Sequence, residues 1–162
     1  MLLIILEIVK SEYNMLTIRQ ATNKDSPRIL ELYQQLSFEP DKYRKAPEED
    51  CRRVLKEIKK YPNAGLLVAE VDGAVVGTTF TAILPGFAHH TAPFCIIEYV
   101  VVDEAQRSKG VGKALMDYCK ERAKEAGCYK IMLTSDKRRD RAHKFYRANG
   151  FESSAEGFRF YF

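Results

Sequence analysis

The stretch Val100-Val-Val-Asp-Glu-Ala-Gln-Arg-Ser-Lys-Gly-Val-Gly-Lys-Ala-Leu115 decides how the rest of this 162-residue chain is interpreted. An apolar strand runs into a basic turn with two glycines, and the turn leads directly into a helical pattern. Amides at a helix N-terminus lack partners inside the helix, and the helix dipole is positive there, so such amides bind anions. Glycine lets this backbone come close to a phosphate group. The stretch therefore predicts a site for a pyrophosphate.

Three cations in or beside the turn add positive charge to this predicted site. The full predicted set is Arg107, Ser108, Lys109, Gly110, Val111, Gly112 and Lys113. Neither the Walker spacing, Gly-x-x-x-x-Gly-Lys-Ser/Thr, nor the dinucleotide spacing, Gly-x-Gly-x-x-Gly, is present. A basic Gly-x-Gly turn also occurs as an ordinary connection between a strand and a helix, so the turn alone leaves that alternative open.

The composition fits one globular domain. With 46% hydrophobic and 30% charged residues, the chain can bury a core and is unlike a disordered protein. The net charge of +4 suits an anionic cofactor and is too small to indicate a nucleic-acid binder. The four cysteines lack CxxC or Cys/His ligand spacing, which predicts free thiols and a reducing cytoplasm.

The chain divides into an N-terminal extension, residues 1–14, and a single domain, residues 15–162. The extension is apolar but interrupted by Glu7, and it is too short to span a bilayer. It also lacks the basic start and the cleavage site of a signal peptide. An additional strand, a dimer contact and an upstream start codon all remain open as explanations of this segment.

Periodicity and turn signals predict the order of secondary-structure elements. The Asp72-Gly73 pair marks a hairpin, and residues 94–102 are apolar enough for a strand covered on both faces. Strands are expected at 16–21, 66–71, 74–84, 94–102, 129–134, 151–152 and 158–162, and helices at 27–36, 47–58, 110–126 and 138–149. The order is β-α-α-β-β-β-α-β-α-β-β, which is an α+β fold with a mixed sheet.

Two motifs together resemble the GCN5-related N-acetyltransferases, the GNAT family. The first, Arg107-Ser-Lys-Gly-Val-Gly112, is similar to the family's coenzyme A motif, Gln/Arg-x-x-Gly-x-Gly/Ala. The second, about thirty residues later, is Ala142-His-Lys-Phe-Tyr-Arg-Ala-Asn-Gly-Phe151, similar to the family's Ala-x-x-Phe-Tyr-x-x-x-Gly-Phe ending. The element order agrees as well, and the resemblance covers residues 15–162. The pattern comes nearest to members that act on small amines, including diamines.

This resemblance implies a mostly antiparallel, twisted sheet with flanking helices, in which the fourth and fifth strands splay apart around the ligand. It implies acetyl-CoA as cosubstrate, no metal, and direct transfer of the acetyl group to an amine. The backbone of Val100, Val101 and Val102 is expected to pair with the pantetheine arm. Asn149 and Arg141 could contact the nucleotide end of the cofactor, but an ordinary helix-surface position explains each of them more simply. A homodimer is a possible assembly, and neither a membrane nor a nucleic acid is expected as a partner.

Glu98 is the candidate general base. It is the only charged residue in 94–102, and transfer to an amine needs a group that accepts a proton from it. It lies twelve residues before Gly110, at a distance where a glutamate often acts as the base in the family it resembles. A Glu98 that is neutralised by an arginine, or bonded to backbone donors, is the structural alternative. Glu104 is the second candidate.

Tyr146 is the candidate general acid, because its phenol could give a proton to the departing thiolate. A ring packed in the core is the alternative, as expected for Phe145. His89 and His90 are expected to be exposed or to line the acceptor pocket, since adjacent histidines point apart and have no ligand partners at metal spacing. Many relatives have glycine where this chain has Ser108, which would be strained at positive φ.

The sequence therefore predicts an N-acetyltransferase that acts on a primary amine of a small molecule. Acidic residues between 39 and 50 could attract a cationic amine, or they could simply form an acidic helix start. Two other functions remain open: transfer to a protein lysine or N-terminal amine, and a non-catalytic regulatory module that binds coenzyme A. The regulatory module would lose the candidate acid and base, whereas this chain keeps Glu98 and Tyr146.

Overall fold

A computed structural model describes residues 8–11, 14–40 and 45–162. The chain forms two compact units, Met1–Met132 and Leu133–Phe162. The first unit contains nearly all of the sheet and three helices, and the second contains the last helix and the irregular C-terminal segment. No helix among the described residues is long and apolar enough to cross a membrane.

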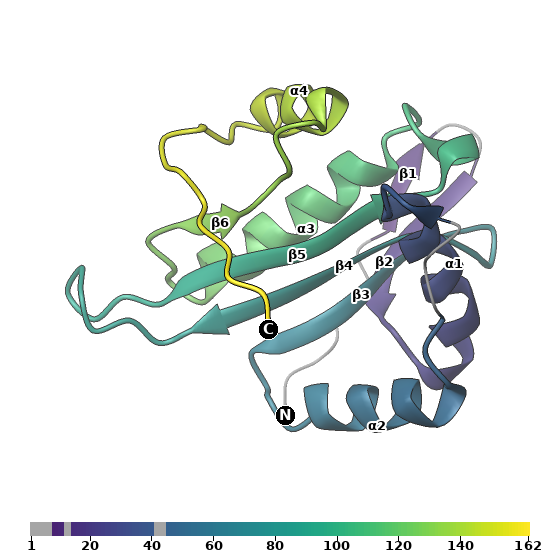
Figure 1. The fold of residues 1–162 in the computed structure, drawn as a ribbon. Helices are drawn as coiled ribbons and strands as arrows, with labels where there is room; N and C mark the ends of the chain where they lie inside the picture. Colours follow the sequence, from purple (N-terminus) through teal and green to yellow (C-terminus); the bar gives the residue numbers. More distant parts are fainter. Residues whose placement is uncertain (1–7, 12–13, 41–44) are drawn as a thin grey trace. The chain divides into compact units, whose positions relative to one another are not determined.

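Figure 1 shows the elements in chain order. The described strands are β1 (Ile8–Ser11), β2 (Asn14–Gln20), β3 (Ala64–Val71), β4 (Ala74–Leu84), β5 (Phe94–Val102) and β6 (Ile131–Leu133). The helices are α1 (Ser26–Leu36), α2 (Glu48–Ile58), α3 (Val111–Glu125) and α4 (Asp140–Ala148), with short 3-10 helices η1 (Asn23–Asp25) and η3 (Glu104–Gln106). The order of strands across the sheet is the same as their order in the chain.

Strands β1 to β5 pair antiparallel with their neighbours, and β6 lies beside β5 and runs parallel to it. The parallel start is fixed by two backbone bonds of 3.0 Å, in which Tyr129 donates to the Pro93 carbonyl and Cys95 donates to the Lys130 carbonyl. Because β6 spans three residues and β5 nine, most of that edge of β5 extends past its described neighbour. The mostly antiparallel α+β fold with a splayed last pair of strands is confirmed.

Helices cover both faces of the sheet in the first unit. α3 packs against β2, β4 and β5, and α1 and α2 pack against β3, β4 and β5. On β4, Gly77 faces α3, whereas the next residue, Thr78, pairs with Val68 in the apolar cluster beneath α1 and α2. Successive residues of a strand point to opposite faces, so α3 lies on one face and α1 and α2 lie on the other.

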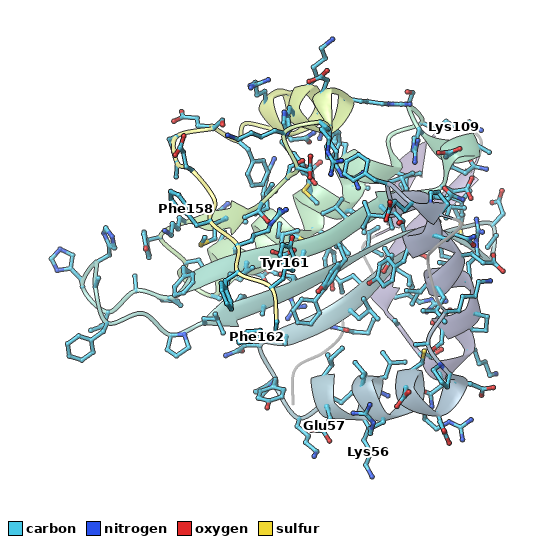
Figure 2. All side chains as sticks on the ribbon, viewed as in Figure 1. Lys56, Glu57, Lys109, Phe158, Tyr161 and Phe162 are labelled. Carbon is cyan, nitrogen blue, oxygen red and sulfur yellow. The ribbon has the colours of Figure 1, made fainter. Side chains whose placement is uncertain are left out.

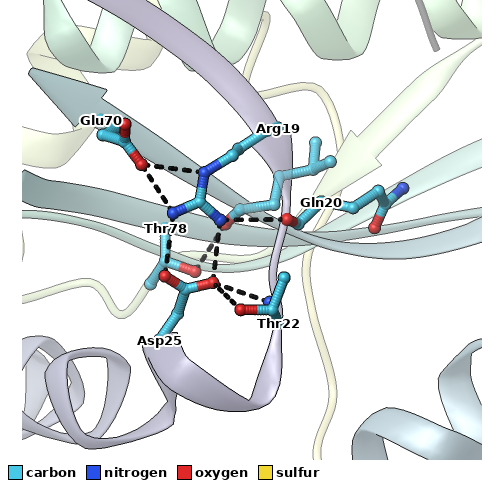
Figure 3. A network of polar contacts seen from close by, with 7 residues as sticks. Arg19, Gln20, Thr22, Asp25, Glu70 and Thr78 are labelled. Atoms are coloured by element: carbon cyan, nitrogen blue, oxygen red, sulfur yellow. Dashed lines mark hydrogen bonds and ion pairs between the residues drawn. The ribbon is translucent and has the colours of Figure 1, made fainter. Parts of the chain in front are cut away.

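The start of α1 is fixed to the sheet by Arg19 on β2 (Figure 3). Its guanidinium donates to both oxygens of Asp25 (2.8 and 2.9 Å), and its Nε and one terminal nitrogen donate to Glu70 Oε2 on β3 (2.8 and 2.6 Å). The buried Asp25 carboxylate also accepts from the amide and hydroxyl of Thr22 (2.7 and 2.9 Å). The bonds from Arg19 and Thr22 lower the pKa of Asp25 to about 2.

The structure departs from the sequence prediction near the C-terminus. In the N-terminal extension, residues 8–11 form a strand beside β2, which is one of the explanations left open for this segment, whereas residues 1–7 and 12–13 lie outside the described residues. The strands predicted at 151–152 and 158–162 are wrong, because the chain is irregular there and Phe158, Tyr161 and Phe162 are exposed (Figure 2). Alternating aromatic residues specify how a strand would face, but a strand also needs a hydrogen-bonded partner. Among the described strands, none pairs with this segment.

Candidate active site

The glycine turn lies between η3 and α3. Gly110 is the residue before α3 and has φ +85°, and its carbonyl accepts the first helical bond, from the Ala114 amide (3.0 Å). The amides between Gly110 and Ala114 therefore lie in the first turn, where they have no acceptor four residues earlier inside the helix. A side chain on Gly110 would meet no heavy atom within 4 Å, so its left-handed backbone, not lack of space, favours glycine. This geometry suits an anion.

Ser108 has φ +65°, which is the left-handed conformation that serine adopts at a cost. The sequence predicts strain at Ser108 if its φ is positive, and its φ is positive. Ser108 and Lys109 are both exposed, and Figure 2 shows Lys109 at the outer edge of the first unit. A strained, exposed residue in a turn beside a helix N-terminus is typical of a binding loop.

Each predicted cation of the turn has an intramolecular partner. Arg107 Nε donates to the Val102 carbonyl (3.1 Å), and another of its nitrogens donates to Glu104 Oε1 (3.2 Å). Lys109 donates to Gln106 Oε1 (3.2 Å), and Lys113 forms an ion pair with Asp117 along α3. Arg107 therefore ties the turn to the end of β5. The Val102 carbonyl, which the sequence assigns to the pantetheine arm, is bonded to Arg107.

Strand β5 contains a bulge beside the candidate base. Thr78 pairs with Val101 and Phe80 pairs with Glu98, so Thr79 lies opposite both Tyr99 and Val100. Tyr99 has φ +56°, which is uncommon for a residue with a bulky side chain. The Thr79 hydroxyl donates to the Glu98 carbonyl (3.1 Å) and supports the distorted backbone.

Glu98 lies on the sheet face that α1 and α2 cover. It pairs with Phe80, Phe80 pairs with Leu66, and Leu66 packs against the apolar cluster beneath these helices. Residues directly opposite each other in antiparallel strands share a face. The Glu98 side chain is half-buried, and within the described part of the chain its carboxylate has no arginine partner. No arginine among the described residues therefore neutralises Glu98.

Tyr99, the residue after Glu98 in the chain, contacts Tyr33 through its ring, and the sequence prediction included neither tyrosine in the site. Tyr33 on α1 and Tyr99 on the bulge have ring centroids 5.7 Å apart, with an angle of 52° between their planes. The Tyr99 side chain is largely exposed. Nothing in the apolar run 94–102 marks the position of a bulge, so no local signal could have identified this pair.

Tyr146 lies on α4, in the second unit. Its ring packs edge-on against Phe145 (5.3 Å) and Phe151 (5.9 Å), and it is half-buried. The side-chain amide of Asn149 donates to the Phe145 carbonyl (2.8 Å) and caps the end of α4. Arg141 is exposed. The Asn149 donor is thus used within its own helix end.

Several of the remaining candidates have local partners. His89 and His90 are exposed, and His89 stacks on Tyr129 with ring centroids 4.0 Å apart. At the start of α2, Glu48 pairs with Arg52 and Asp50 pairs with Arg53, which favours the simple acidic helix start; Asp41 lies outside the described residues. In the described ranges, no group of three or more His, Cys, Asp or Glu side chains could hold a metal ion.

A bulged strand leads into an amide-rich turn before a helix, an arrangement that suits an anionic ligand. The sequence model of the Acetyltransferase (GNAT) family matches residues 16–151. The chain therefore belongs to this family, and it is an acetyltransferase whose acetyl donor is acetyl-CoA.

Three known proteins resemble this chain over different parts of its length. A transcriptional regulator from Bacillus halodurans C-125 has a similar structure, with a TM-score of 0.84 and 34% identity over 91% of this chain and 99% of that one. Glucosamine 6-phosphate N-acetyltransferase of Trypanosoma brucei brucei is 39% identical over 82 residues, which is 50% of this chain and 53% of that enzyme. Aminoglycoside N(6')-acetyltransferase type 1 of Stenotrophomonas maltophilia is 26% identical over 85% of this chain and 87% of that enzyme.

Proposed function

We propose that this protein transfers the acetyl group of acetyl-CoA directly to a primary amine of a small molecule. The observation that carries this proposal is the turn 107–112, where left-handed Ser108 and Gly110 bring the chain from β5 into the N-terminus of α3. Two similar enzymes are named for glucosamine 6-phosphate and for aminoglycosides, and both of these acceptors are small amino sugars.

Transfer to an amine requires a base. An alkyl ammonium has a reference pKa of about 10.4, so near pH 7 roughly one amine in a few thousand is neutral. Recovering the neutral nucleophile costs roughly 4–5 kcal/mol, at about 1.36 kcal/mol per pKa unit. We assign this proton transfer to Glu98, directly or through one water. It is half-buried on the face covered by α1 and α2, and no arginine among the described residues pairs with its carboxylate.

The reaction forms one bond and breaks another. Glu98 takes one proton from the ammonium and later releases it to solvent. The neutral amine nitrogen attacks the thioester carbonyl carbon, the carbon–sulfur bond breaks, and the nitrogen loses a second proton, which balances the one that the thiolate gains. The departing thiolate takes a proton from an acid, for which we propose the phenol of Tyr146. For cofactor binding we propose the backbone of Val100–Val102 and the residues of the turn, Arg107–Lys113; among these, the Val102 carbonyl contributes only if Arg107 releases it.

The variant Gly112→Glu tests the cofactor site. A carboxylate at the second position of α3 would repel the diphosphate, so isothermal titration with coenzyme A should detect no binding. Gly157→Glu introduces the same charge in the irregular segment of the second unit and should bind like the wild-type protein. Unchanged affinity in Gly112→Glu would reject residues 107–112 as the diphosphate site.

An acceptor screen tests the rest of the proposal. Consumption of acetyl-CoA should be measured with diamines, amino sugars, aminoglycosides, amino acids and short peptides. Turnover with peptides alone would replace the small-molecule acceptor with a protein amine. Binding of coenzyme A without turnover on any of these amines would favour a regulatory module.

We also propose that the protein works in a reducing compartment, the cytoplasm. Its four cysteines are free, and Cys95 and Cys119 are buried. Burial raises the pKa of Cys119 to about 12, and it also raises the pKa of Cys95, so both remain unreactive thiols.

A further inference from the structure

Gln35, at the end of α1, contacts the corner between β5 and the cofactor turn. Its Nε2 donates to Asp103 Oδ2 (3.2 Å), and its Oε1 accepts from the Glu104 backbone amide (3.1 Å). Asp103 and Glu104 are consecutive residues at the start of η3. One side-chain amide therefore engages both an acceptor and a donor of the same corner.

Asp103 holds this corner from the other side. Its Oδ1 accepts from the Ala105 amide (2.9 Å) and so caps the start of η3, and its Oδ2 accepts from the Arg28 guanidinium. Arg28 Nε in turn donates to the Val75 carbonyl of β4 (3.1 Å). The Asp103 side chain is mostly buried, with 14% of its surface exposed, so water competes little for these bonds.

A short series of bonds leads from Gln35 to the cofactor turn. Glu104, whose amide Gln35 binds, accepts from the Arg107 amide through its carbonyl (3.4 Å) and from the Arg107 guanidinium through Oε1 (3.2 Å). Arg107 is the first residue of the turn 107–112. Gln35 is thus two contacts away from the arginine that begins the proposed diphosphate site.

We propose that Gln35 is a positioning residue for coenzyme A binding, which acts through Asp103 and Glu104 on Arg107. The inference rests on the proposed function of the turn 107–112. Helix α1 is already anchored at its start by the Arg19–Asp25–Glu70 contacts and in its first half by Arg28. The Gln35 bonds therefore add order chiefly to the corner, and a corner ordered before binding loses less conformational freedom when the ligand arrives.

The test compares two neighbouring glutamines. Gln35→Met removes both bonds and keeps the side-chain length, whereas Gln34→Met makes the same replacement at a position whose side chain has no hydrogen bond to another described residue. Titration with coenzyme A should show a Kd raised about two- to tenfold in Gln35→Met, the change that corresponds to one ordinary hydrogen bond. Gln34→Met should bind like the wild-type protein.

A purely structural role predicts a different pattern. Glu70→Gln weakens the anchor at the start of α1, and should lower the melting temperature without changing the Kd for coenzyme A. If Gln35→Met behaves like Glu70→Gln, the inference is overturned, while the proposed function stands because the wild-type protein binds. If the wild-type protein itself does not bind coenzyme A, the proposed function fails first.

A double variant checks the route of the effect. On an Arg107→Met background, Gln35→Met should raise the Kd by less than about twofold, because residues that act through one another are not additive. Full additivity would contradict action through Arg107. Should Gln35→Met fail to fold, Gln35→Glu keeps the acceptor for the Glu104 amide but faces Asp103 with a second carboxylate. That variant should weaken coenzyme A binding in the same direction, and unchanged binding would reject the inference.

Discussion

Ser108 and Tyr99 both have left-handed backbones, and each lies beside a group that we assign to cofactor binding or catalysis. Left-handed conformations cost an L-residue roughly 1–2 kcal/mol. Strain of this kind persists where the surrounding structure enforces it, and it is found preferentially at functional sites. At the residue scale, the proposed site thus combines a left-handed backbone at Ser108 and Tyr99 with the candidate side chains.

Replacing Ser108 with glycine should remove this strain. We expect Ser108→Gly to raise the free energy of unfolding by about 0.5–1 kcal/mol, because glycine adopts positive φ without a steric cost but gains more freedom in the unfolded chain. Denaturant unfolding measures the change. Ser37→Gly is the matched control. Ser37 has φ −72°, so the same replacement there should lower the free energy of unfolding. A loss of stability in Ser108→Gly would contradict the strain.

The phenol of Tyr146 is the second test at this scale. Tyr146→Phe keeps the ring packing against Phe145 and Phe151 but removes the proposed proton donor. The value of kcat should fall about 100-fold or more, the usual contribution of a general acid, with little change in the Kd for coenzyme A. Adding Phe145→Tyr to the Tyr146→Phe variant places a hydroxyl on the neighbouring ring and should not restore turnover. Equal kcat values for Tyr146→Phe and wild type would remove Tyr146 from the mechanism.

At the scale of elements, the close approach of α3 to the sheet depends on Gly77 of β4. A Cβ added there would lie 3.2 Å from the Val101 carbonyl oxygen and 3.3 Å from carbons of Val111 and Leu115. These distances are shorter than ordinary van der Waals contacts, so either α3 or β5 would have to move. Both elements contribute to the proposed cofactor site, so we expect the spacing between them to affect coenzyme A binding as well as stability.

Gly77→Ala should accordingly lower stability by about 1–3 kcal/mol, the usual cost of overpacking a core. It should also weaken coenzyme A binding, because α3 would shift relative to β5. Thermal unfolding and titration measure the two effects. Gly157→Ala is the control, since its added Cβ would meet only a Thr134 methyl carbon at an ordinary 3.6 Å. A fully stable Gly77→Ala protein would show that the contact between α3 and the sheet is looser than these distances indicate.

At the scale of the whole molecule, buried carboxylates set how stability depends on pH. The pKa of Asp25 is lowered from its ordinary 3.8 to about 2 by its bonds to Arg19 and Thr22. Burial acts to raise the pKa of Asp103, but the bonds from Arg28, Gln35 and the Ala105 amide lower it overall. A group with a lowered pKa binds fewer protons when folded, so it stabilises the protein above the unfolded pKa.

The stabilisation from Asp25 should therefore be complete above about pH 4 and should disappear as the pH falls towards 2. The shift corresponds to about 2 kcal/mol. Melting temperatures from pH 7 to pH 2, followed by circular dichroism, should fall most steeply between pH 4 and 2. Asp25→Asn should be less stable at pH 7 but should lose less over that interval. Parallel curves for the two proteins would show that Asp25 does not contribute.

Local sequence patterns determined many of the helices, strands and turns of this protein, and also its family. The hairpin at Asp72-Gly73, the limits of β5 and the glycine turn before α3 follow from backbone conformations and periodicities that act within a few residues. The two spaced motifs identified the family for the same reason, because each motif needs only its own residues to be recognised. The C-terminal strands failed because their pattern is local but their existence requires a partner.

Tertiary structure alone decided the bulge at Tyr99, the face on which Glu98 lies, and the contact of Gln35 with Asp103. The bulge arises from the register of β5 against β4, and a register is a property of two strands. Gln35 and Asp103 lie 68 residues apart in the chain, so neither residue carries a local signal for the other. Local sequence determines which secondary structure each segment can form. Contacts between distant segments form only when the whole core packs, so they depend on the tertiary structure.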